Sequence, residues 1–209
     1  SILSMVGDDN EGGLIKSLLK KIEIKSDGLT TKKNSVTTNK TRFISGNSQL
    51  LRLDRDSVDK PNFEKEMNYL NNNISSYNSI IISDYNKGYC SSKLVKSVIK
   101  EARKSKIPVF IDPKGENWRK YSNSFCITPN IKEAELILKA SLENDLDFEN
   151  AARVICEKYK IESCLITRGS DGMTFFNGHR AIHQKVGEKE VFDVSGAGDT
   201  VISCFCASF

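Results

Sequence analysis

The sequence predicts an α/β protein with a mostly parallel central sheet flanked by helices and a small antiparallel hairpin. Short, continuously apolar segments alternate with segments whose apolar residues recur at helical spacing, and one further segment alternates polar and apolar residues. Strands that are apolar throughout are typical of parallel sheets covered by helices on both faces. With 209 residues the chain is long enough to bury a substantial core, and we expect one domain over residues 1–209.

The segment 39–54 is predicted to be the hairpin, with its turn at 46–48. Arg42 and Arg52 alternate with apolar residues along its two strands. This alternation predicts a small sheet with one face in water and one face covered. A hairpin of this kind within an α/β chain indicates a lid or a contact between subunits, and we delimit it at about residues 36–56.

Four short apolar runs are predicted to be the strands of the parallel sheet, and they are joined by helical segments. The predicted strands are 79–83, 108–112, 124–128 and 163–167. The predicted helices are 92–104, 131–139 and 148–159. A last apolar run, 201–209, follows a glycine-rich segment, and we expect it to continue a helix that begins there.

Each predicted strand of the parallel sheet is followed by a cluster of polar residues. The clusters are 84–88 (DYNKG), 112–115 (DPKG), 128–133 (TPNIKE) and 167–172 (TRGSDG). Ligands of open α/β sheets bind beyond the carboxyl ends of the strands. Any one cluster is also compatible with an ordinary loop, but four of them at one edge predict a single shared site.

The segment 196–199 (GAGD) adds an anion site at the start of the last helix. Glycines there let backbone N–H groups approach an anion, and the helix dipole favours negative charge. Asp199 lies in the predicted first turn of that helix. Its carboxylate suits a general base for a substrate hydroxyl, but it is equally compatible with a charge that only stabilises the helix N-terminus. The residues alone leave both interpretations open.

Motifs and charge argue against several other classes of protein. There is no G-x-x-x-x-G-K-[ST] motif and no protein-kinase signature, so the chain is neither a P-loop enzyme nor a protein kinase. No run of about 18 apolar residues occurs, which argues against a membrane span. The net charge of +4 comes from lysines scattered among acidic residues, which is typical of a solvated surface and not of a nucleic-acid interface.

The cysteines and histidines show no metal-ligand spacing. The six cysteines are Cys90, Cys126, Cys156, Cys164, Cys204 and Cys206. They lie mostly in apolar stretches, so we expect buried free thiols in a reducing cytoplasm, not disulfides or a zinc site. His179 and His183 flank a segment predicted to be a strand, and without a third ligand we expect no metal there.

The motifs, taken in order, resemble those of a known family. Residues 193–200 (DVSGAGDT) are similar to the second signature of the ribokinase-like (PfkB) carbohydrate kinases. The resemblance covers essentially the whole chain and also rests on NKTRFIS, QLLRLD, SDYNKG, IDPKG, TPNIKEAE and TRGSDGM. Within the family it is strongest to the D-glycero-β-D-manno-heptose 7-phosphate kinases, which often form the N-terminal half of a bifunctional protein with an adenylyltransferase.

The resemblance implies roles for the residues at matching positions. Asp199 matches the catalytic base, and the N–H groups around Gly196, Ala197 and Gly198 match the anion hole for the transferred phosphate. Glu133 is further implied to hold Mg²⁺ through water. The implied ATP contacts are Asn130, Ile131, Lys132, Glu133, Thr167, Arg168, Gly169 and Gly172. The implied substrate contacts are Lys87, Lys114 and, on the hairpin, Arg42.

The implied reaction is the ATP- and Mg²⁺-dependent phosphorylation of the C1 hydroxyl of D-glycero-β-D-manno-heptose 7-phosphate to the 1,7-bisphosphate. This step belongs to ADP-heptose biosynthesis for lipopolysaccharide and related glycans. The hairpin resembles a lid that covers the sugar and pairs between subunits, which implies a homodimer. Two alternatives stay open: a kinase of another sugar phosphate or of a nucleoside, and an inactive fragment of the fold.

The resemblance also implies that residues 1–209 are an incomplete kinase domain. A Gly-Gly-x-x-Asn-Val-Ala sugar-binding signature is expected before Ser1, and the last helices with part of the adenine pocket are expected after Phe209.

Overall fold

The computed structural model describes residues 1–46, 48–187 and 196–209, which divide into two compact units. The first unit comprises Ser1–Tyr69 and Lys87–Ser91, and the second comprises Leu70–Asn86 and Ser92–Phe209. Within the described ranges, no helix is both long and apolar enough to span a membrane.

The first unit contains a pair of parallel strands connected through a helix. β1 (Leu3–Gly7) pairs with β2 (Gly28–Lys32), and α1 (Asn10–Lys21) connects them. The Asp9 carboxylate caps α1 by accepting a hydrogen bond from the Gly12 N–H. The sequence patterns above predict none of these elements, because two glycines in the first turns of α1 and polar residues in β2 weaken both periodicities.

The predicted hairpin is confirmed. β3 (Asn39–Ser45) pairs with β4 (Ser48–Arg55) in antiparallel register, with an irregularity after Phe43. The expectation of one covered face is wrong for the single chain, because within the described residues nothing buries it. Phe43 and Leu51, which lie directly opposite each other, are 48% and 58% exposed, and Leu53 is 59% exposed.

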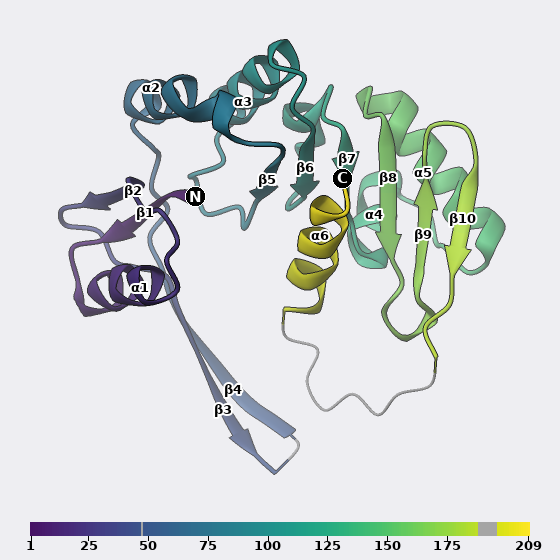
Figure 1. The fold of residues 1–209 in the computed structure, drawn as a ribbon. Coiled ribbons are helices and arrows are strands. Elements are labelled where there is room, and N and C mark those ends of the chain that lie inside the picture. The colour runs from purple at the N-terminus through teal and green to yellow at the C-terminus, as the bar shows by residue number, and fades with distance from the viewer. Residues whose placement is uncertain (47, 188–195) are drawn as a thin grey trace. The chain divides into compact units, whose positions relative to one another are not determined.

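The second unit contains a sheet of six described strands in the order β10-β9-β8-β7-β6-β5 (Figure 1). Their bounds are β5 (Ile80–Ser83), β6 (Val109–Asp112), β7 (Cys126–Ile127), β8 (Ser163–Thr167), β9 (Met173–Phe176) and β10 (Ala181–Gln184). β5 to β8 are parallel, whereas β9 and β10 extend the sheet in antiparallel fashion. The four parallel strands are those predicted from the apolar runs.

Helices cover both faces of this sheet. They are α3 (Ser92–Lys104), α4 (Ile131–Leu138), α5 (Asp145–Tyr159) and α6 (Ala197–Ala207). The strand order from β5 to β8 advances in one direction, so right-handed crossovers place α3, α4 and α5 on the same face. α6 lies on the opposite face (Figure 1). α5 begins earlier than predicted because Asn144 and Asp147 form a capping box at its start.

The remaining helical segments are short or connect the units. α2 (Phe63–Asn73) follows the hairpin and continues into the 3₁₀ turn η1 (Ile74–Ser76) before β5. Two further 3₁₀ turns, η2 (Trp118–Tyr121) and η3 (Gly169–Asp171), lie in loops that follow β6 and β8.

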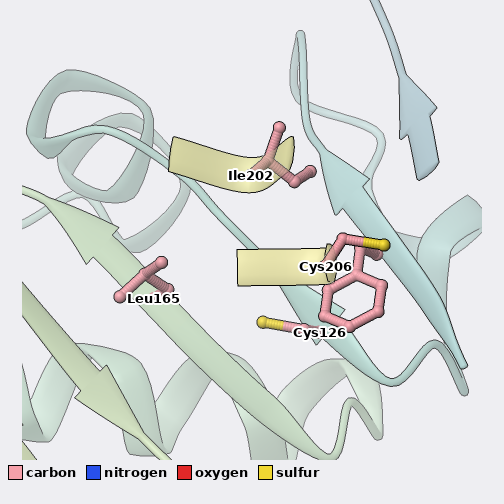
Figure 2. Close-up of a cluster of buried hydrophobic side chains, with 5 residues drawn as sticks. Cys126, Leu165, Ile202 and Cys206 are labelled. Atoms are coloured by element: carbon pink, nitrogen blue, oxygen red, sulfur yellow. The ribbon is translucent and has the colours of Figure 1, made fainter. Parts of the chain in front are cut away.

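A buried cluster fixes α6 on the sheet. Its members are Phe110, Cys126, Leu165, Ile202 and Cys206. Figure 2 shows Ile202 and Cys206 of α6 lying over the strands that carry Leu165 and Cys126. Phe205 of α6 adds an edge contact to the Phe110 ring, with centroids 5.8 Å apart. Because its later turns are buried here, α6 holds its first turn in a fixed position.

All six cysteines are free. The expectation of burial is confirmed for Cys126, Cys156, Cys164 and Cys206, whereas Cys204 is exposed and Cys90 is partly exposed. Burial raises the pKa of the Cys126 thiol to about 12.

Candidate active site

The glycine segment forms the start of α6, as predicted. Gly196 precedes the helix with a φ of 76°, a conformation that favours glycine, and Ala197 begins the helix. Gly198 and Asp199 therefore lie in the first turn, where backbone N–H groups have no acceptor within the helix. An anion placed before this turn would meet these donors and the positive end of the helix dipole. The preceding residues of the predicted signature, 193–195, lie outside the described residues.

The carboxylate of Asp199 faces the end of β5. The hydroxyl of Tyr85, two residues beyond that strand, lies 3.3 Å from one carboxylate oxygen of Asp199 and 3.4 Å from the other. Residues far apart in the sequence thus meet at the carboxyl edge of the sheet. The sequence predicted that the polar clusters converge at this edge. The contact between Tyr85 and Asp199 shows this convergence for the cluster 84–88 and the segment 196–199.

Asp112, at the end of β6, lies near two other carboxylates. Burial, and then the negative charges of Glu133 and Asp199, raise the pKa of Asp112 to about 6, while Lys114 opposes the shift. The hydroxyl of Ser83 lies 3.5 Å from an Asp112 oxygen. A carboxylate whose pKa is raised partly by neighbouring negative charges would be stabilised by a cation.

Asn130 and Glu133 form a capping box at the start of α4. The Asn130 side-chain oxygen accepts a hydrogen bond from the Glu133 N–H, and Glu133 accepts one from the Asn130 N–H, both at 3.0 Å. The other Glu133 oxygen accepts a hydrogen bond of 2.8 Å from the Lys114 side chain. The capping box alone would explain both residues structurally, but the contact with Lys114 links them to the cluster around Asp112. Ile131 and Lys132 follow in the first turn of α4.

The loop after β8 lies beside the start of α4. The Thr167 N–H donates to the Pro129 carbonyl at 2.9 Å, and Thr167 is bridged to Asn130. Gly169 and Gly172 both have positive φ. A Cβ on Gly172 would collide with the Gln184 carbonyl, so this glycine is required for the loop to pack against the end of β10.

The Arg168 side chain points to α5 and β9. It forms an ion pair with Asp145, donates to the Thr174 hydroxyl at 3.3 Å, and its guanidinium lies 4.2 Å from the centre of the Phe148 ring. Its side chain is only 12% exposed. Arg168 therefore holds the loop to the sheet and helix.

A cavity of about 670 Å³ adjoins this loop. It is lined by Glu143, Asn144, Asp145, Leu146, Arg168, Ser170, Asp171, Lys185 and Val186. The cavity is polar and open, and it lies on the side of the loop that faces the start of α5.

The three predicted substrate contacts are distributed over both units. Lys114 lies in the second unit, in contact with Glu133. Lys87 lies in the first unit, where it forms an ion pair with Asp56. Arg42 lies opposite Arg52 on the exposed hairpin. Within the second unit, the structure therefore links Lys114 to the carboxylates near Asp199.

Sequence reasoning missed the part played by Asp84. This residue is buried, forms an ion pair with Lys120 and accepts a hydrogen bond of 2.8 Å from the Tyr121 hydroxyl. The same hydroxyl accepts a 3.2 Å hydrogen bond from the Lys114 N–H. Asp84 thus joins two polar clusters inside the protein. The polar loop contains no sign of this, because Lys120 and Tyr121 lie in η2, a short 3₁₀ turn that no sequence pattern predicts.

Comparison with known proteins gives a consistent result. The model of a family described as "pfkB family carbohydrate kinase" matches residues 1–209. Among curated proteins, "Bifunctional protein HldE" of Aliarcobacter butzleri is 39% identical over 205 residues, covering 97% of this chain and 43% of that protein. The protein of the same name from Geobacter sulfurreducens is 36% identical over 207 residues, covering 97% and 42%. The chain therefore spans less than half the length of these relatives.

Solved structures confirm the ribokinase-like α/β fold. Ribokinase of Arabidopsis thaliana, determined with ribose and ATP, superposes with a TM-score of 0.81 at 18% identity, covering 99% of this chain and 68% of that one. Phosphofructokinase-2 of Escherichia coli, determined with substrates and products, gives 0.74 at 18% identity, covering 98% and 67%. At this identity the likeness concerns the fold.

Proposed function

Since this chain belongs to the pfkB family of carbohydrate kinases, we propose that it transfers the γ-phosphoryl group of ATP to a sugar hydroxyl. The observation that carries the proposal is the position of Asp199, in the first turn of α6 and beside the carboxylates that follow the parallel strands. An anion-binding helix start next to a carboxylate is what phosphoryl transfer to an alcohol requires.

Asp199 would take the proton from the sugar hydroxyl. A placed base of this kind contributes about 10²- to 10⁴-fold in rate. The N–H groups around Gly196, Ala197 and Gly198 would stabilise the charge on the transferred phosphoryl group, because they meet it without reorganisation. Lys114, whose side chain contacts Glu133, would neutralise phosphate charge.

The nucleotide would lie along the ends of β7 and β8. Asn130, Ile131, Lys132 and Glu133 at the start of α4 would contact its phosphates, together with Thr167, Arg168, Gly169 and Gly172 of the neighbouring loop. The bridge between Thr167 and Asn130 supports this, because it holds the two segments side by side. The cavity beside the loop has room for the nucleoside end.

Mg²⁺ would be held near Glu133 and Asp112 through water. Their carboxylate oxygens are the donors that Mg²⁺ prefers, and no group of three or more acidic, histidine or cysteine side chains among the described residues forms a direct cage. When bound, the ion would neutralise charge on the ATP phosphates. Burial is the largest cause of the raised pKa of Asp112, and the charges of Glu133 and Asp199 add to it; a cation would relieve this second part, which supports the fit.

We propose D-glycero-β-D-manno-heptose 7-phosphate as the sugar and its C1 hydroxyl as the acceptor. The motifs of the hairpin and of residues 83–88, and identity of up to 39% to proteins named HldE, favour this substrate. Arg42 and Lys87 are the further residues that we propose as contacts of the sugar phosphate. A kinase of another sugar phosphate or of a nucleoside is the alternative.

Three further points belong to this proposal. The exposed apolar residues of the hairpin would be buried in a homodimer, in which the hairpin also acts as a lid. Residues 1–209 would be an incomplete kinase domain of a longer protein. Its free thiols would suit the cytoplasm, where ATP is available.

The test is a substrate panel with the full-length protein that carries this chain. We expect ATP-dependent turnover of heptose 7-phosphate, detected as a 1,7-bisphosphate by ³¹P NMR, and little turnover of fructose 1-phosphate or adenosine. Preference for either of the latter would overturn the choice of sugar.

Asp199→Asn tests the catalytic assignment. We expect kcat to fall by about 10²-fold or more while ATP binding, followed by calorimetry, persists, because the variant removes a base and keeps the shape. Undiminished turnover would refute the role of Asp199.

A further inference from the structure

We propose that Tyr85 is a positioning residue for this reaction: its hydroxyl holds the carboxylate of Asp199 in the orientation needed to accept a proton. The inference rests on the proposed function of Asp199. It assigns a role to Tyr85, which belongs to the polar cluster 84–88.

The Tyr85 hydroxyl lies within reach of both carboxylate oxygens of Asp199. The Tyr85 hydroxyl lies 3.3 Å and 3.4 Å from the two oxygens of Asp199, so neither is preferred. These distances are longer than the usual 2.7–2.8 Å or so for O–H···O bonds, as is common in catalytic hydrogen bonds without substrate. An acidic residue in the first turn of a helix is otherwise attracted back to the N–H groups of its own helix. A donor at the end of β5 holds it toward the sheet edge instead.

The environment keeps Tyr85 protonated and therefore a donor. Burial, followed by the negative charges of Asp199 and Asp112, raises the pKa of Tyr85. A tyrosinate beside two carboxylates is disfavoured, so Tyr85 is unsuited to take the proton of the sugar itself. Its part is to orient the residue that does.

The backbone on either side of Tyr85 is fixed. Asp84, the preceding residue, is held by Lys120 and by the Tyr121 hydroxyl. Asp84 also accepts a 2.7 Å hydrogen bond from the Asn86 N–H, which closes a tight turn around Tyr85. A positioning group is effective only when surrounding contacts fix its own place. The contacts of Asp84 and Asn86 fix the backbone that carries Tyr85.

Tyr85 could instead bind the sugar, because it is 51% exposed. The two roles differ in kinetics. Loss of a sugar contact that is equal in the ground and transition states raises KM and leaves kcat unchanged, whereas loss of orientation at the base lowers kcat and leaves KM unchanged.

The first experiment compares Tyr85→Phe with wild type and with Tyr77→Phe in the full-length protein. Tyr77 precedes the opposite end of β5 and provides the same chemical change away from Asp199. We expect Tyr85→Phe to lower kcat about tenfold or more, with both KM values within about twofold and an unchanged melting temperature. Tyr77→Phe should retain kcat. A raised KM for the sugar at constant kcat would overturn the inference.

The second experiment does not depend on activity. Tyrosine is labelled with ¹³C at Cζ, and the signal of Tyr85 is assigned by its absence in Tyr85→Phe. We expect Asp199→Asn to lower the pKa of Tyr85, because it removes a nearby negative charge. An unchanged pKa would overturn the contact. Absence of wild-type turnover on every sugar would overturn the proposed function, whereas wild-type turnover with an unaffected Tyr85→Phe variant would overturn only this inference.

Discussion

Asp112 lies where three carboxylates come close together, and its pKa makes the stability of the protein depend on pH. The folded-state pKa is about 6, above the ordinary value of 3.8, with burial as the largest cause. A carboxyl group whose pKa is raised by folding stabilises the folded state below its unfolded pKa, and this contribution is lost as the pH rises through about 6.

We therefore expect Asp112→Asn to stabilise the metal-free protein at pH 8 relative to wild type and to have little effect near pH 4. Melting temperatures across this range, in a chelating buffer, measure the difference. Asp171→Asn, at an exposed loop position, serves as the control and should not show the same pH dependence. A higher melting temperature for wild type than for Asp112→Asn at pH 8 would contradict the burial of an unfavourable charge at Asp112.

The sequence predicted where the candidate site residues stand on their elements, but not the contacts among them. Asp199, Asn130 and Glu133 stand at helix starts, where a local pattern of glycine, asparagine and acidic residues is visible in the sequence. The contact of Asp199 with Tyr85 joins residues separated by more than a hundred positions, and no local pattern contains it. Such a contact depends on strand order and on the packing of α6, which only the folded chain defines.

At the level of elements, the loops that follow β5 and β6 are joined inside the protein. Lys120 forms a buried ion pair with Asp84, and Tyr121 bonds both Asp84 and the Lys114 N–H. A buried charge that loses its partner remains desolvated, which typically costs about 3–5 kcal/mol. This network holds the loops that carry Tyr85 and Lys114.

We expect Lys120→Met to lower the free energy of unfolding by about 3–5 kcal/mol, measured by urea denaturation. Lys104→Met provides a matched control, because it breaks an exposed pair with Glu101 that is worth about 0–1 kcal/mol. The additional change Asp84→Leu should restore part of the loss, since it removes the orphaned charge. Equal effects of the two lysine substitutions would rule out this account of the network.

The elements themselves were predictable to different degrees. β5 to β8 are continuously apolar because both faces of the sheet are covered, and the pattern identified all four. β9 was missed, because this four-residue strand, which lies antiparallel between β8 and β10, alternates partly exposed and buried residues and has no such run. The expectation that one face of the hairpin is covered was wrong for the single chain. Alternation of polar and apolar residues predicts that one face is buried, but it does not show whether the same chain or another one buries it.

At the scale of the whole molecule, one short motif belongs to two units. Asp84 to Asn86 lie in the second unit, whereas Lys87 and Gly88 return to the first. There Lys87 pairs with Asp56, and a Cβ on Gly88 would lie 2.7 Å from the Asp59 carbonyl oxygen. Proximity in sequence suggested that Asp84 and Lys87 serve one cluster, but the division of the chain gives them different surroundings.

The hairpin gives the last prediction, which concerns assembly. Phe43, Leu51 and Leu53 expose apolar surface on strands that, within the described part of the chain, pair with no third strand. Exposed apolar surface of this kind is usually buried by a partner, and a two-stranded hairpin is marginal on its own. A homodimer joined through the hairpins would satisfy both requirements.

We expect the full-length protein to have the mass of a dimer by light scattering and Leu51→Lys to shift it to the mass of a monomer, because a charge directly opposite Phe43 opposes burial. Gln49→Lys adds the same side chain at an exposed polar position of the same strand and should leave the dimer intact. If the hairpin is also the lid over the sugar, Leu51→Lys should raise the KM for the sugar and spare the KM for ATP. If the wild type is a monomer, no surface joins the subunits. If Leu51→Lys remains a dimer, a surface other than the hairpin joins them.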